Sequence, residues 1–183
     1  MKQKLYLSQL VSKFREAVNN GQLDNTSEET MRGWINELLS LFGWDVKNTK
    51  QVHQERTLSK EQRELLGEIG SHNIRPDYTL VNGSVKLAFV DAKDLDVDIH
   101  TNKSAAFQIR SYGWSIGAKF SILTNFREFA ISIAGDKRLQ NVAASITPAD
   151  KASIASIVFL FTFLKKNTTA DPSEVIAQVN IVA

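Results

Sequence analysis

Apolar residues near the start of the chain recur with the period of a helix. Residues 3–19 carry them at i, i+3, i+4 and i+7, the spacing that gathers side chains on one helical face. This stripe consists of Leu7, Leu10, Val11, Phe14 and Val18. A second stripe, between Thr26 and Gly43, consists of Met31, Trp34, Ile35, Leu38, Leu39 and Phe42. The pattern predicts two amphipathic helices, and Thr26 with Glu29 fits a capping box at the start of the second helix.

Apolar and β-branched runs in the next part of the chain predict strands. Residues 44–55 predict one strand after the second helix. Residues 77–81 and 85–93 predict two more, on either side of Asn82-Gly83, a dipeptide typical of hairpins. We therefore expect these two strands to pair as a β-hairpin.

The remaining segments predict further helices and strands. Residues 57–73 are polar and contain two glycines, so we expect a loop with room for a short helix. Residues 102–117 predict a helix, and residues 119–124 and 128–134 predict strands. Residues 148–166 are strongly apolar and predict a final helix. Helices that precede and separate strands are typical of an α/β domain with a mixed sheet.

The composition is that of a globular protein and limits the available chemistry. The 183 residues suit one domain, and the absence of cysteine excludes disulfides, thiolate metal sites and cysteine nucleophiles. The net charge of +2 neither requires nor excludes nucleic acid as a partner. Residues 1–18 are amphipathic, unlike a signal peptide, and the longest apolar run, residues 154–164, is too short to span a bilayer. We therefore expect a cytoplasmic protein without a membrane segment.

An acid and an amine stand together at the end of one predicted strand. Asp91 and Lys93 are two residues apart, so they point to the same face of that strand, just beyond the apolar run 87–90. Such a pair can be a plain ion pair or a set of solubilising charges at a sheet edge. It can also be catalytic, with the carboxylate holding a divalent cation and the ammonium stabilising a developing anion. The pair alone leaves all three interpretations open.

Asp77 adds a second acid on the neighbouring predicted strand. Two carboxylates that converge on one point repel each other unless a cation lies between them, so removing either should maintain or raise the stability of the metal-free chain. Mg²⁺ is held by one or two carboxylates together with waters and phosphate oxygens of a substrate, and it helps to form a hydroxide nucleophile. Lys93 would then orient the attacking water or share the charge of the transition state. The structural alternative for Asp77 is a Pro-Asp turn at the start of a strand.

The hairpin geometry decides whether the two aspartates can meet. A two-residue turn at residues 82–83 would pair Asp77 with Ala88 and send Asp91 to the opposite face of the sheet. A three-residue loop with a left-handed glycine at its end would put both aspartates on one face. Even then, a bend or bulge near Pro76, or a still wider loop, is needed to bring Asp77 opposite Asp91. We expect one of these irregularities.

These residues carry a resemblance to a known family. Pro76-Asp77, followed by Asp91-Ala92-Lys93, matches the signature of the PD-(D/E)XK nuclease superfamily. The resemblance implies a restriction-endonuclease-like core, in which a mixed sheet is flanked by helices in the order α-β-β-β-α-β. It also implies that Asp77 and Asp91 bind Mg²⁺, for which Mn²⁺ can substitute, and that Lys93 assists the nucleophile.

A motif on the next predicted helix extends the resemblance. Gln108 and Tyr112 have the spacing Q-x-x-x-Y, which places both on one helical face. This motif resembles that of nuclease domains in type I restriction subunits, type IIG restriction enzymes and RecB-like nucleases. The flanking segments also resemble the restriction branch, so the resemblance covers roughly residues 25–133. It implies that Gln108 and Tyr112 lie near the lysine or near the DNA backbone.

Members of this family also carry a glutamate on the opening helix. Glu29 is our choice for that position, with Glu28 and Glu37 as alternatives. A purely structural role for Glu29, in the capping box, is the competing interpretation. Glu55 could also approach the metal from the strand that precedes Asp77.

Together these features predict a metal-dependent endodeoxyribonuclease of the restriction type. Residues 1–183 would form a single nuclease domain with an N-terminal helix in residues 1–21, a core in residues 25–133 and a C-terminal helical extension in residues 134–183. The expected phosphate contacts are Lys103, Arg110 and Lys119.

Two other interpretations remain open. One is a non-catalytic module on the same fold that binds nucleic acid or serves in assembly. The other is a structural protein whose acid–lysine pair is only an ion pair. The chain has no Walker motif and no NPPY or DPPY motif, so we expect any motor, methyltransferase or specificity function to come from further subunits or domains.

Overall fold

The computed structural model describes residues 2–54, 76–116, 118–134, 139–143 and 145–166. The predicted loop at 57–73, Glu55 and the segment after residue 166 lie outside these ranges. The helices are α1 (Lys2–Asn19), α2 (Glu28–Leu41), α4 (Lys103–Ile116) and α5 (Lys151–Lys166). The strands are β1 (Val52–Gln54), β2 (Tyr78–Asn82), β3 (Val85–Ala92), β4 (Phe120–Thr124), β5 (Phe129–Ile133) and β6 (Leu139–Ala143).

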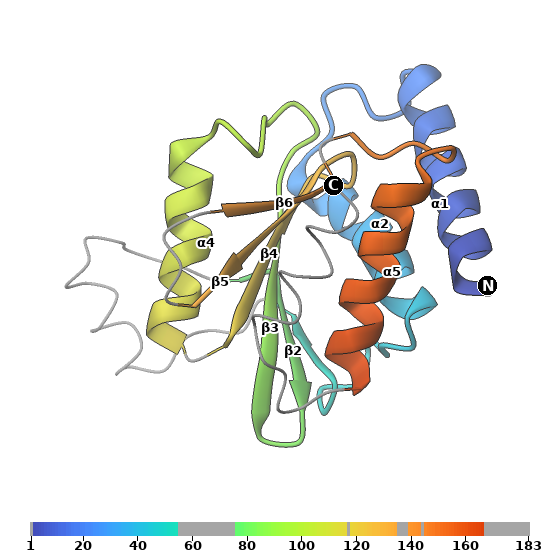
Figure 1. The fold of residues 1–183 in the computed structure, drawn as a ribbon. Helices are drawn as coiled ribbons and strands as arrows, with labels where there is room; N and C mark the ends of the chain where they lie inside the picture. Colours follow the sequence, from blue (N-terminus) through green and yellow to red (C-terminus); the bar gives the residue numbers. More distant parts are fainter. Residues whose placement is uncertain (1, 55–75, 117, 135–138, 144, 167–183) are drawn as a thin grey trace.

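The described strands form one six-stranded sheet whose spatial order follows the chain from β1 to β6. Strands β3 and β4 are parallel, and α4 is the crossover between them, while the other neighbours are antiparallel. Figure 1 shows α4 on one side of this sheet and α1, α2 and α5 on the other. The element order α2, β1, β2, β3, α4, β4 is the α-β-β-β-α-β order expected from the sequence, and the mixed α/β sheet is confirmed.

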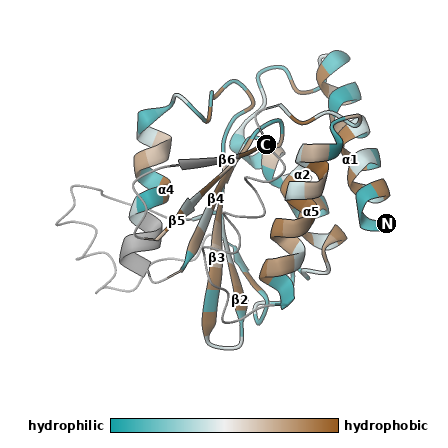
Figure 2. Cartoon of the chain, viewed as in Figure 1, coloured by the Kyte–Doolittle hydropathy of each residue, from teal (hydrophilic) through white to brown (hydrophobic). Residues whose placement is uncertain are grey.

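Each face of the sheet has its own apolar core. The larger core joins the sheet to α1, α2 and α5, and the aromatic rings of Phe14, Trp34 and Phe126 meet in it at centroid distances of 4.8–5.8 Å. The smaller core lies under α4 and includes Phe89 of β3 and Leu123 of β4. Figure 2 shows that α5 is largely apolar along its length, yet none of the helices in the described ranges combines the length and apolar character needed to cross a membrane.

Most predicted elements are confirmed, with three corrections. The strand expected at 44–55 is limited to β1, because turns occupy the residues between α2 and Val52. The capping box is wrong: the N-cap of α2 is Ser27, and the Thr26 hydroxyl donates to the carbonyl of Leu23, 2.9 Å away. The extension after residue 134 is not wholly helical, because β6 pairs with β5 at the edge of the sheet before α5 begins.

The β2–β3 hairpin contains the irregularity that the aspartates require, but at a different place. Asn82 pairs with Val85, so the turn is Gly83-Ser84, with Gly83 first and left-handed at φ 60°, the position that glycine takes in type II′ turns. The register then shifts, since Val81 pairs with Lys86 whereas Leu80 pairs with Ala88. The shift leaves Leu87 as one extra residue in β3, which is a β-bulge. The predicted three-residue loop and the predicted bulge near Pro76 are therefore wrong, because the irregularity lies at Leu87.

Candidate functional site

The bulge brings the two predicted aspartates face to face. On the side of the bulge away from the hairpin turn, Tyr78 pairs with Val90. Continuing that register by one residue places Asp77 opposite Asp91. The alternative with the aspartates on opposite faces is thereby excluded, because directly opposed residues share a face of the sheet. Both side chains are buried, with 5% of Asp77 and 3% of Asp91 exposed.

Asp91 and Lys93 form a close ion pair where β3 emerges from the sheet. Lys93 Nζ lies 2.7 Å from Asp91 Oδ2, and only 13% of the lysine side chain is exposed. Burial raises the pKa of Asp91 to about 6, although the Lys93 ammonium opposes the change and the nearby Asp77 adds to it. Burial lowers the pKa of Lys93, but the charges of Asp91, Glu28 and Asp77, together with the hydrogen bond to Asp91, outweigh it and leave that pKa raised. The lysine is therefore a cation at neutral pH.

Asp77 is held by two donors from different elements. Arg32 of α2 places Nη2 2.6 Å from Asp77 Oδ1, and the Ala92 backbone N–H donates to Asp77 Oδ2 over 2.5 Å. Burial raises the pKa of Asp77 in spite of these two partners. The Tyr78 hydroxyl also donates to the carbonyl of Arg32, 3.1 Å away, which ties α2 to β2 beside the site.

The glutamates of α2 reach the cluster in different ways. Glu28 Oε1 lies 3.5 Å from Lys93 Nζ, so the residue that we weighed as an alternative is the one that contacts the lysine. Glu29, our first choice, instead places Oε2 3.0 Å from Arg32 Nη1, with 79% of its side chain exposed. Glu37 lines a surface groove between α1 and α2. The opening helix thus presents Glu28 to Lys93 and Arg32 to Asp77.

Arg32 is the site residue that sequence reasoning missed. It belongs to no part of the signature, and a single arginine on an amphipathic helix is an ordinary surface residue by pattern. Its spacing from Glu28 and Glu29, at i+4 and i+3, does place all three on one helical face. That spacing would point to Arg32 as a site residue only if Asp77 were already known to face this helix.

The residues of the predicted helix motif and the predicted phosphate contacts do not all lie in the same part of the structure. Gln108 is half-buried on α4, and the side chain of Tyr112 is outside the described part of the chain. Lys103 and Arg110 line a groove at the start of α4. Lys119 precedes β4, and because Ala88 is the partner of Phe120, it lies at the opposite end of the β3–β4 pair from Asp91. The structure therefore does not bring Lys119 to the aspartates.

The segment that leaves the site is fixed by Asn125. This side chain is fully buried, and its Nδ2 donates to the carbonyls of Leu95 and Val97 at 3.3 and 2.9 Å. Its Oδ1 accepts the backbone N–H groups of Arg127 and Glu128 at 3.1 and 2.8 Å. The β4–β5 turn thus holds the chain just after Lys93, which limits how far the lysine can move from Asp91.

The donor set fits a hard divalent cation. In the described ranges, no group of three or more histidine, aspartate and glutamate side chains is placed to hold a metal ion. Asp77 and Asp91 nevertheless face each other, and the charge of Asp77 adds to the raised pKa of Asp91. Two carboxylates, completed by waters and substrate phosphate oxygens, suffice for Mg²⁺. A cation between them would also offset the repulsion from Asp77, which adds to the effect of burial on the pKa of Asp91.

The raised pKa of Asp91 predicts how stability changes with pH. The carboxyl takes up its proton near pH 6 when folded but near its ordinary pKa of 3.8 when unfolded, so between these values the folded state binds more protons. The free energy of unfolding should therefore fall as pH rises from about 4 to above 6, by on the order of 3 kcal/mol from this group. Asp77 acts in the same direction.

Urea unfolding at several pH values, with wild type and Asp91→Asn side by side, measures this dependence. The difference between the two proteins isolates Asp91 from the other carboxyl groups. Asparagine should gain stability relative to wild type as pH rises from about 4 to 6, and the difference should level off above that pH. Parallel pH profiles for the two proteins would contradict the prediction.

The fold and the site define an α/β domain that presents a buried acid–acid–lysine cluster at the end of its central parallel strand. The chain is similar to the type II restriction enzyme and methyltransferase RM.Eco57I of Escherichia coli, with 31% identity over 134 residues. The match covers 72% of this chain and 13% of the relative, so the chain spans about an eighth of that protein's length. This similarity supports a relation to restriction–modification enzymes. No model of a known protein family matches the chain, and no solved structure matches it.

Proposed function

We propose that the chain is a Mg²⁺-dependent DNA endonuclease domain of the PD-(D/E)XK type that hydrolyses phosphodiester bonds in a restriction–modification system. The observation that carries the proposal is the register that sets Asp77 opposite Asp91 with the Lys93 ammonium 2.7 Å from Asp91. The α-β-β-β-α-β order and the relation to a restriction enzyme support it. A structural ion pair would not require a second buried carboxylate beside it.

Asp77 and Asp91 would hold the metal, and Mn²⁺ could replace Mg²⁺. When bound, the ion would neutralise phosphate charge and lower the pKa of a water molecule. To accept it, Asp77 must share or release an oxygen that now faces Arg32 or the Ala92 N–H. A carboxylate oxygen has more than one lone pair, so sharing is chemically possible.

Lys93 would act through its charge rather than as a base. Its raised pKa keeps it protonated at neutral pH, so it has no free electron pair with which to accept a proton from water. A fixed ammonium in a buried site stabilises negative charge that develops on a phosphate oxygen. Asp91 and Glu28 hold the ammonium from two sides and thereby orient it.

The partners in this proposal are DNA and further parts of a restriction enzyme. The relative is named both a restriction enzyme and a methyltransferase, and the chain corresponds to a small part of its length. Motor, methyltransferase or specificity functions would therefore come from additional domains or subunits. The competing function is a non-catalytic module that binds DNA on the same fold.

A plasmid-relaxation assay tests the proposed function. Because one such site cuts one strand at a time, the chain should convert supercoiled DNA to nicked circles before linear DNA appears, with Mg²⁺ or Mn²⁺ and not in EDTA. The Asp91→Asn protein is the matched control. Metal-independent cleavage would refute the proposal, and DNA binding without any metal-dependent nicking would favour the non-catalytic module.

A further inference from the structure

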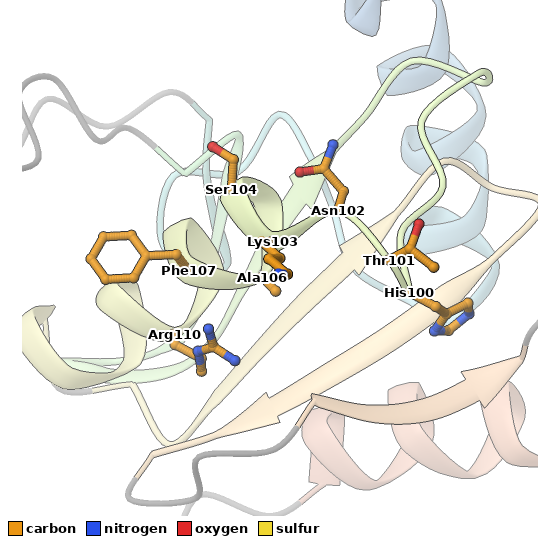
Figure 3. Close-up of a pocket in the computed structure, with 8 residues that line it drawn as sticks. All are labelled: His100, Thr101, Asn102, Lys103, Ser104, Ala106, Phe107 and Arg110. Carbon is orange, nitrogen blue, oxygen red and sulfur yellow. The ribbon is translucent and has the colours of Figure 1, made fainter.

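A groove of about 810 Å³ opens beside the first turns of α4, away from the aspartates described above. Figure 3 shows its lining side chains, which come from α4 and from the loop that precedes it. Lys103, Phe107 and Arg110 are spaced i, i+4 and i+7, so they share one face of the helix. The buried residues Ala105 and Ile109 occupy the opposite face, against the sheet. The groove therefore follows the solvent side of α4.

The lining combines positive charge, small polar groups and one exposed aromatic ring. Lys103 and Arg110 supply the charge, and Thr101, Asn102 and Ser104 supply hydroxyl and amide groups. Phe107 is 46% exposed and extends outward from the helix in Figure 3. No carboxylate is found among the groove residues that the structure describes. An exposed ring flanked by cations is typical of surfaces that bind nucleic acid strands.

The loop that forms the groove is held in place by its own hydrogen bonds. Asp98, which precedes the groove residues in the chain, accepts the backbone N–H groups of His100 and Thr101 through Oδ1 at 2.9 and 3.1 Å. Asn102 accepts the N–H of Ala105 at 2.9 Å and begins the helix. The polar side chains are thus displayed from a defined backbone and need little ordering when a ligand binds.

We propose that this groove binds the sugar–phosphate backbone of the DNA substrate, with phosphates contacting Lys103 and Arg110 and a sugar or base lying against Phe107. The inference rests on the proposed function, since it assigns a second contact surface for the same substrate. DNA suits the lining better than a protein partner does, because a protein surface carries charges of both signs whereas every phosphate is an anion.

The location of the groove supports a shared substrate. Helix α4 covers the face of the sheet to which Phe89 points, and Asp91, two residues later, points to the same face. A segment of only nine residues connects Lys93 to Lys103, and Asn125 anchors it. The groove and the aspartates therefore lie on the same side of the sheet, joined by a fixed segment of chain.

Binding of a fluorescein-labelled duplex in EDTA, followed by anisotropy at several salt concentrations, tests this inference without cleavage. Lys103→Gln combined with Arg110→Gln should weaken binding about ten- to fiftyfold near 0.1 M salt and reduce the salt slope by about 1.8, the value for two lost phosphate contacts. Phe107→Ala should weaken binding about fivefold to tenfold with the slope unchanged. Lys4→Gln with Lys13→Gln on α1 is the control, since it changes the net charge equally on the other side of the sheet.

The outcomes separate this inference from the proposed function. If the groove variants bind DNA as the α1 control does, or if the full chain binds no DNA, the groove assignment is wrong, whatever the nuclease assay gives. A groove serving another protein would give the same unchanged DNA binding. If the groove variants lose binding but wild type never nicks DNA with metal, the groove assignment stands and the nuclease proposal fails.

Discussion

Alanine in place of Asp77, Asp91 or Lys93 is expected to lower the rate of metal-dependent DNA cleavage on the order of a thousandfold or more. In the proposed mechanism each aspartate supplies a charge that holds the metal, and Lys93 supplies an ammonium held 2.7 Å from Asp91. Initial nicking rates of supercoiled DNA at saturating Mg²⁺ measure the effect. Cleavage at the wild-type rate by any of the three variants would contradict the proposed function.

Matched controls separate loss of chemistry from loss of charge or fold. Asp96→Ala removes an exposed acid from the segment just after Lys93, and Lys86→Ala removes a lysine from the other end of β3. Both should cut at close to the wild-type rate. Far-UV circular dichroism and urea unfolding check that the inactive variants remain folded.

The structure changes the expected stability of one inactive variant. Removing either aspartate relieves repulsion, which alone would maintain or raise stability. Asp77, however, accepts the buried N–H of Ala92 and pairs with Arg32. Alanine at residue 77 leaves that N–H without its acceptor, which costs about 1–3 kcal/mol. Asparagine at residue 77 keeps an acceptor oxygen and should cost less.

Methionine in place of Arg32 is expected to lower the Mg²⁺ concentration for half-maximal cleavage about tenfold, equivalent to about 1.4 kcal/mol. The guanidinium lies 2.6 Å from Asp77 Oδ1. It therefore occupies the oxygen that the metal would use and repels a second cation. Methionine has similar length but no charge, so it removes this competition. A Mg²⁺ titration of nicking at about pH 8, above the pKa of Asp91, measures the shift.

Arg32→Lys is the matched control, because it retains the charge and should stay near the wild-type metal requirement. A readout independent of catalysis is the rise of the melting temperature with Mg²⁺ concentration, which reports metal binding to the folded chain. If Arg32 only supports the fold, methionine should weaken metal binding and cleavage together. A higher Mg²⁺ requirement in the methionine variant would therefore contradict the prediction that Arg32 competes with the metal for Asp77.

The sequence alone was sufficient to predict those helices and strands that bury a regular apolar face. The stripe of α1 and the continuous apolar run of β3 place their residues in the cores as predicted. It was insufficient for β6, because Leu139–Ala143 carries little alternation and is defined by pairing with β5. The predicted capping box was wrong for a related reason. The Thr26 hydroxyl donates to the nearby carbonyl of Leu23 and does not cap the N–H groups of the helix.

The site could be predicted in part for similar reasons. Asp91 and Lys93 share a face through strand alternation, which depends only on local backbone geometry. The position of Asp77 opposite Asp91 depends instead on the register shift in the hairpin. Arg32 and the choice of Glu28 over Glu29 for contact with Lys93 depend on how α2 is rotated against the sheet. That rotation is set by packing between distant segments, such as the contact of Phe14 with Trp34, and local patterns do not encode it.

The bulge at Leu87 has a consequence for how chains of this kind are found by sequence. In a regular hairpin with a two-residue turn, directly paired residues differ in number by an odd amount, yet Asp77 and Asp91 differ by fourteen. The extra residue in β3 allows Asp77 and Asp91 to lie directly opposite each other although their numbers differ by an even amount. A hairpin without the extra residue would build the same pair from a spacing of thirteen. Searches for related chains should therefore require opposition across the strands and allow the intervening length to vary.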